Sequence, residues 1–151
     1  MTSDRAIINI LEEQVNTYKR LLDLLEEERQ CLVSINAEKI EEISKVKDTV
    51  VMRLRLLEEE RIRLMKKFAE DNGILNGINL DDLGRHTGNG AFSELRSRML
   101  SILQNIDEMN KVNSILIDRS LRYIKTTASF FHSFTTQHIP QTTGVLLSKE
   151  T

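Results

Sequence analysis

Residues 108–124 read EMNKVNSILIDRSLRYI, and apolar side chains recur through this stretch at intervals of three and four residues. That spacing is the period of an α-helix that buries one face. Asn113 stands in the middle of the apolar seam. A buried amide lowers stability, but it also disfavours every helix register that leaves the amide without a partner. We therefore expect Asn113 to align neighbouring helices; the alternative is a contact with a binding partner.

Outward from this stretch, the same spacing predicts three long helices. It runs through residues 91–134, and two earlier stripes predict helices over residues 3–34 and 37–70. Asn36 is the expected N-cap of the second helix. Lys47 occupies a seam position of that helix, where we expect its methylene groups to pack while its charge reaches water.

The segment between the second and third helices contains several Asn-Gly pairs and no strand pattern. DNG at 71–73 predicts a helix end, because glycine adopts the left-handed conformation without steric cost. We expect a loop with at most one short helical turn over residues 79–84 and a flexible GRHTGNG at 84–90. The predicted fold is all-α. It is an elongated, coiled-coil-like, antiparallel three-helix bundle that forms a single domain over residues 1–138.

Composition and charge narrow the function. The chain has 21 basic and 23 acidic residues mixed along its length, so no basic face is available and nucleic acid is not an expected partner. The start, MTSDRAII, has no secretory signal, and no apolar run approaches the ~18 residues of a membrane span. These features predict a cytoplasmic protein without stable membrane insertion. The single cysteine, Cys31, fits a small buried side chain in a reducing compartment.

No catalytic, metal-binding or cofactor-binding residues are predicted. His86, His132 and His138 belong to neither an H-E-x-x-H nor a Glu-x-x-His pair, so a zinc or di-iron site lacks its ligands. GRHTGNG at 84–90 lacks the G-K-[ST] ending and the preceding strand of a phosphate-binding loop. We do not expect an enzyme.

The third helix is longer than the helices available to cover it. At 1.5 Å per residue the first two helices are each about 50 Å long and the third is about 65 Å long. We expect residues 125–138 to project beyond the hairpin as a frayed segment that holds three of the five phenylalanines. An exposed apolar patch indicates a binding surface, although these rings would also be accounted for if they capped the bundle's own core.

The predicted partner-binding residues of the third helix are apolar, except for Asn113. They are Asn113, Leu116, Ile117, Leu121, Ile124, Phe130, Phe131 and Phe134. The tail at residues 139–151 is polar and expected to be disordered, and its apolar triplet Val145, Leu146 and Leu147 is a further candidate docking element.

Two stretches carry a family resemblance: LLDLLEEERQCLVSINAEKIEEISKVKDTVVMRLRLLEEERIRLM at 21–65 and NKVNSILIDRSLRYI at 110–124. In order and spacing they resemble the FlgN family of flagellar export chaperones. In that family a helical hairpin precedes a loop and a last long helix with an Asn-x-x-Asn-x-x-Leu signature. Asn110, Asn113 and Leu116 match this signature.

The resemblance implies a non-enzymatic cytoplasmic chaperone. It would bind the carboxy-terminal helical segments of the hook-filament junction proteins FlgK and FlgL, prevent their premature assembly, and deliver them to a component of the type III export gate. Family members use the last helix and tail for these contacts. IPQTTG at 139–144 keeps Gly144 but lacks the tyrosine of the family's Tyr-Gly-x-x-Gly stretch. A structural homo-oligomeric coiled coil without a client remains an open alternative, and a homodimer is compatible with either.

Overall fold

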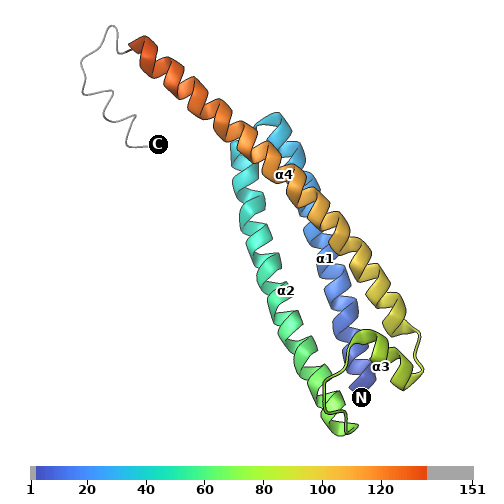
Figure 1. Ribbon diagram of the computed structural model, residues 1–151. Coiled ribbons are helices and arrows are strands. Elements are labelled where there is room, and N and C mark those ends of the chain that lie inside the picture. Colours follow the sequence, from blue (N-terminus) through green and yellow to red (C-terminus); the bar gives the residue numbers. More distant parts are fainter. Residues whose placement is uncertain (1–2, 136–151) are drawn as a thin grey trace.

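The computed structural model describes residues 3–135, which form four helices (Figure 1). They are α1 (Ser3–Ser34), α2 (Ala37–Asp71), α3 (Leu80–Thr87) and α4 (Ala91–Thr135). The described part of the chain contains no strand, which confirms the all-α class. The three long helices begin at the expected residues and end within one residue of the expected positions.

The turn between α1 and α2 is short because its local chemistry closes both helices. Ile35 takes the left-handed conformation, with φ 54°, and the backbone N–H of Asn36 donates to the carbonyl of Cys31 at 3.0 Å. The side chain of Asn36 then accepts a hydrogen bond from the backbone N–H of Lys39 at 3.2 Å, which is the N-cap predicted from the sequence. α2 therefore folds back directly along α1.

The connection between α2 and α4 is more ordered than the sequence suggested. α3 has two turns rather than one, and it includes Arg85 and His86 of the stretch expected to be flexible. Asn79 caps its start by accepting from the backbone N–H of Asp82 at 2.8 Å, and Gly88 ends it in the left-handed conformation, with φ 69°. Leu83 is fully buried, so tertiary packing holds a helix that would be unstable alone. The prediction of a loop with at most one short helical turn was therefore wrong for residues 80–87.

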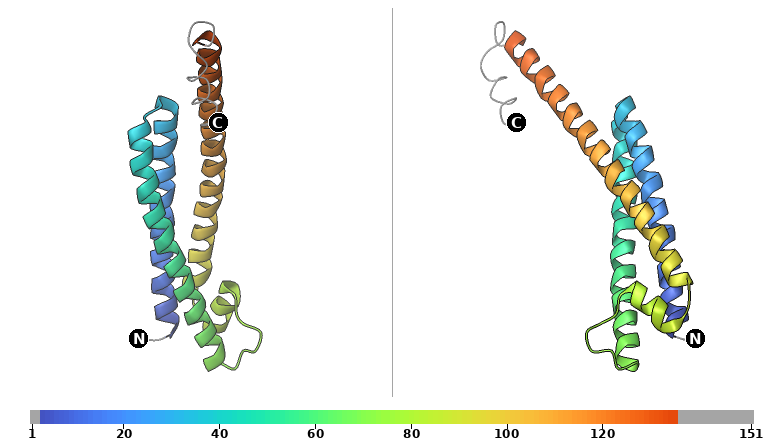
Figure 2. Two further views of the ribbon diagram at one scale, coloured as in Figure 1. Left: turned by 90° about the vertical axis from the view of Figure 1, so that its left-hand side faces the viewer. Right: turned by 45° about the vertical axis from the view of Figure 1, so that its right-hand side comes forward.

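The long helices form an array centred on α1. α2 runs antiparallel to α1, whereas α4 runs in the same direction as α1, and both pack along it (Figure 1). The backbones of α2 and α4 hardly approach each other. A closed bundle in which each long helix packs against both others is therefore not confirmed. Figure 2 shows the last part of α4 leaving the α1–α2 hairpin and extending past its turn.

The core lies toward the end of the molecule that contains α3. Ile7, Leu11 and Phe92 are completely buried there, together with Leu83. Phe68 of α2 packs its ring edge-on against His86 of α3, with 5.7 Å between the ring centroids. Along α4 the buried residues extend from Phe92 to Asn113 and no further. The start of α4 is therefore anchored in the core and its end is not.

This distribution predicts very different costs for the same substitution at two leucines. Leu11→Ala should lower the free energy of unfolding by about 2–5 kcal/mol, because it removes a completely buried side chain and leaves a cavity. Leu121→Ala, at a side chain that is 50% exposed, should change it by less than about 0.5 kcal/mol. Urea unfolding followed by circular dichroism measures both. Equal losses would show that the end of α4 is covered by its own chain.

Candidate functional site

The candidate site is the part of α4 that follows Asn113. No residue from Ser114 to Thr135 is buried. Asn113 lies beside Leu25 and Glu28 of α1, and α1 ends only six residues after Glu28. At 1.5 Å per residue this leaves most of the last 30 Å or so of α4 without a neighbouring helix. The length difference inferred from the sequence is therefore present in the structure.

The predicted residues on this segment carry large apolar side chains that are partly or mainly exposed. The exposed fractions are 39% for Ile117, 50% for Leu121, 59% for Ile124, 72% for Phe130, 58% for Phe131 and 62% for Phe134, and Leu116 is half-buried. The exposure starts directly after Asn113, earlier than the expected boundary at residue 125. The segment is also continuous helix to Thr135 rather than frayed. Residues 136–138 and the triplet Val145, Leu146 and Leu147 lie outside the described residues.

Sequence reasoning missed two large exposed side chains of this segment, Ile115 and Tyr123. Ile115 is 52% exposed and lies on the opposite side of α4 from Asn113. Tyr123 is 68% exposed and was not among the predicted partner-binding residues. The missed signal is its spacing, because Tyr123 falls seven residues before Phe130 and therefore on nearly the same side of α4. The exposed apolar side chains thus extend along the segment and do not gather only at its end.

Asn113 differs from the other predicted partner-binding residues because it is buried. Only 2% of it is exposed, and its amide nitrogen donates to the backbone carbonyl of Leu25 and to Oε1 of Glu28, both at 2.9 Å. Its Oδ1 is buried without a hydrogen-bond partner among residues 3–135. The amide is engaged within the chain, as the alignment hypothesis expected, so we leave Asn113 out of the exposed surface.

The carboxylate of Glu28 joins the three long helices. It accepts from Asn113 of α4, and its other oxygen lies 2.9 Å from Nζ of Lys47 on α2, although Glu28 is only 5% exposed. Lys47 was expected to reach water from the seam, but it pairs with this buried acid instead. Glu28 itself was not predicted, because it belongs to a run of three glutamates that resembles a solvated face.

A second polar cluster links α1 and α2 nearer the core. The completely buried Gln14 donates to Oε2 of Glu58 at 2.7 Å, and the Arg61 guanidinium also binds that carboxylate. The hydrogen bond from Arg61 holds the pKa of Glu58 below its usual value. Burial, together with the nearby Glu58 charge, raises the pKa of Tyr18. This cluster is an inter-helix contact rather than an acid–base pair in a cleft.

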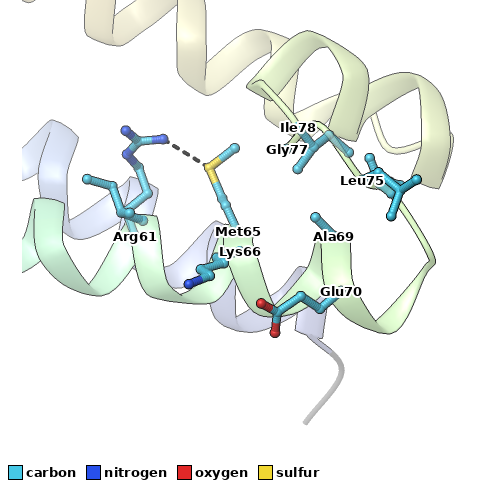
Figure 3. Close-up of a pocket in the computed structure, with 10 residues that line it drawn as sticks. Arg61, Met65, Lys66, Ala69, Glu70, Leu75, Gly77 and Ile78 are labelled. Atoms are coloured by element: carbon cyan, nitrogen blue, oxygen red, sulfur yellow. Dashed lines mark hydrogen bonds between the residues drawn. The ribbon is translucent and has the colours of Figure 1, made fainter.

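A pocket of about 450 Å³ lies between the end of α2 and the segment that leads to α3. Figure 3 shows Met65 and Ala69 of α2 facing Leu75 and Ile78 of that segment, with a hydrogen bond between Arg61 and Met65. The lining carries no group of side chains that resembles a catalytic set. Across residues 3–135 no three His, Cys, Asp or Glu residues are grouped so that they could hold a metal ion. Nor does any described helix have the length and apolar character needed to cross a membrane.

Residues 3–135 form helices only, and the last helix presents an exposed apolar face, an architecture typical of helical binding proteins. The family model described as "FlgN protein" matches residues 1–142. The chain therefore belongs to the FlgN family, the flagellar export chaperone family, which confirms the resemblance inferred from residues 21–65 and 110–124. No curated protein and no solved structure matches the chain.

The Glu28 network predicts a measurable coupling between helices. Glu28→Ala should lower the free energy of unfolding by about 1–3 kcal/mol, because it leaves the buried Asn113 amide with an unsatisfied N–H. The matched control Glu27→Ala, at an exposed neighbour, should cost less than about 0.5 kcal/mol. Asn113→Ala combined with Glu28→Ala should cost less than the sum of the two single changes, by about 0.5 kcal/mol or more. Urea unfolding of the unsubstituted protein, the two single variants at Glu28 and Asn113 and the double variant tests this coupling. Strict additivity of the two free-energy changes would contradict it.

The Glu58–Arg61 contact predicts a dependence of stability on pH. Because the pKa of Glu58 is lowered on folding, its contribution is complete above the unfolded value of about 4.5 and is lost as the pH falls below it. Glu58→Gln should therefore reduce the difference in unfolding free energy between pH 7 and pH 3. Glu59→Gln, at an exposed neighbour, provides the control. An equal effect of the two substitutions would contradict a specific role of the Arg61 contact.

Proposed function

We propose that this protein is a cytoplasmic flagellar export chaperone that binds the carboxy-terminal helical segments of the junction proteins FlgK and FlgL. It keeps them from assembling early and delivers them to the type III export gate. Membership of the FlgN family supports the chaperone role. The observation that carries the site is that α4 continues from Ser114 to Thr135 without a buried residue while presenting large apolar side chains.

The physical basis of client binding is burial of these side chains. Tyr123, Ile124, Phe130 and Phe131 are all more than half exposed. Covering a side chain of this size stabilises a complex by roughly 1.5–3 kcal/mol before the cost of ordering is subtracted. An amphipathic client helix laid along this face would hide its own apolar stripe at the same time. A client held in this way has no free stripe with which to assemble.

The same stripe supports a second candidate function. Apolar residues at intervals of three and four would also join two copies of α4 into a homo-oligomeric coiled coil without a client. Analytical ultracentrifugation at micromolar concentration separates the two. A monomer that forms a one-to-one complex with a FlgK or FlgL fragment supports the chaperone, whereas a stable oligomer that does not bind the fragment supports the scaffold.

The double variant Phe130→Asp/Phe131→Asp tests the assigned face. The melting temperature should stay within about 2 °C, because both rings are exposed, and affinity for a carboxy-terminal FlgK fragment should fall by on the order of 100-fold. The control Met52→Asp/Leu75→Asp introduces the same charge at two exposed apolar residues away from α4. Calorimetric titration measures binding, and differential scanning calorimetry measures stability. A large loss of stability would place the rings in the core, and unchanged affinity would exclude them from the client site.

A further inference from the structure

The apolar face of α4 beyond α1 is the continuation of an interface that already exists. On a helical wheel centred on Asn113, the buried Leu95 and Ile106 fall within about 20° of Asn113, and the exposed Ile124 and Phe131 do so as well. The side of α4 that packs on α1 therefore carries apolar residues beyond the end of α1 as well. A helix that binds there packs on the same side of α4 as α1 does, and it meets a surface with the spacing of a helix-packing face.

The charge of this segment differs from that of the chain. The whole chain has more acidic than basic residues, 23 against 21, whereas residues 114–135 hold three basic residues, Arg119, Arg122 and Lys125, and one acidic residue, Asp118. Arg119 and Lys125 fall about 120° to either side of Asn113, just behind the apolar face, and their long side chains can reach its two edges. Within residues 3–135 neither cation forms an ion pair, although Lys111, just before the segment, pairs with Asp107.

We propose that the face formed by Ile117, Ile124 and Phe131 selects an amphipathic helix whose apolar stripe is bordered by acidic side chains. This inference rests on the proposed chaperone function and adds the chemical class of the client. Glutamates or aspartates on both edges of the client meet Arg119 and Lys125 where water is partly displaced, which favours the correct partner and speeds its association. A helix with basic edges meets like charge and is rejected.

The same observations disfavour two other occupants. A second copy of α4 would bring the same cations to the same edges, so like charges would face each other across the contact. A lipid surface favours helices with a strongly cationic polar face, but the face opposite the stripe holds Ser129 and Ser133 on either side of a single cation, Arg122. Ser120 lies near the centre of the stripe, where a small side chain permits the close approach of another helix.

The test uses the full chain and two synthetic amphipathic helices of about 21 residues that share one leucine and isoleucine stripe. One has glutamate and the other lysine at both edges of the stripe. Fluorescence anisotropy at low and moderate salt should show that the glutamate helix binds on the order of tenfold more tightly than the lysine helix and that added salt reduces the difference. Arg119→Glu/Lys125→Glu should reverse the preference. The control Arg20→Glu/Lys67→Glu, which makes the same charge change at exposed residues of α1 and α2, should keep it.

Each outcome decides a separate point. Equal affinity for the two helices, or no effect of Arg119→Glu/Lys125→Glu, overturns the charge selection, and the proposed function then stands if the FlgK fragment still binds through Phe130 and Phe131. Failure of the FlgK fragment and both helices to bind overturns the proposed function as well. Binding to vesicles that contain anionic lipid, without binding to either helix, would assign the face to a membrane surface and overturn the inference. Circular dichroism of each variant checks that it remains folded.

Discussion

The buried carboxylate of Glu28 is the contact on which the arrangement of the long helices depends. It binds Lys47 of α2 on one side and Asn113 of α4 on the other, and it lies near the end of α1. The hydrophobic seam below it is built from leucine, isoleucine and methionine at a regular spacing, and such a seam packs almost equally well after a shift of one heptad. An amide that must meet one particular carboxylate and one particular carbonyl does not allow that shift. The Glu28 network therefore sets where α4 leaves α1.

This network is not expected to add much net stability. A buried ion pair loses hydration of both charges, and well-packed apolar residues in the same place are often as stable. The unpaired Oδ1 of Asn113 adds a further cost. The network instead fixes one register of α4 against α1. That register decides which residues of α4 are covered by α1. A slipped α4 would bury part of the face that follows Asn113 or expose part of the seam that ends at Asn113.

Much of the fold follows from local sequence signals. The bounds of the three long helices follow from periodicity, and the Asn36 cap follows from the chemistry of its side chain. Two features did not follow. Glu28 is buried because it faces Lys47 of α2 and Asn113 of α4, and no property of a three-glutamate run identifies which member faces inward. α3 exists because Leu83 fills the end of the core, and this tertiary contact outweighs the weak helix propensity of a glycine-containing segment.

The greater length of α4 was predictable for a different reason. The length of a helix is proportional to its number of residues, so the predicted helix bounds alone show that α4 is longer than its neighbours. The position at which exposure begins was less accurate, because it depends on where α1 lies along α4 and on the angle at which α4 diverges. The side chains that mark the change are Asn113, the last buried residue of α4, and Ile117, the first exposed residue on the same side of the helix.

Under the proposed function, one stripe serves two purposes along a single helix. Up to Asn113 it is covered by α1 and holds the fold together; beyond Asn113 the same spacing continues with larger rings at Tyr123, Phe130 and Phe131. Aromatic side chains bury more area for few rotatable bonds, which suits a contact that forms with another molecule rather than within the core. A helix without tertiary contacts is marginal in water, so anchoring the first half of α4 in the core lets the second half propagate from an existing helix without a new nucleation step. In the proposed complex the client meets a face that is already helical, so a smaller share of the binding free energy is lost to ordering.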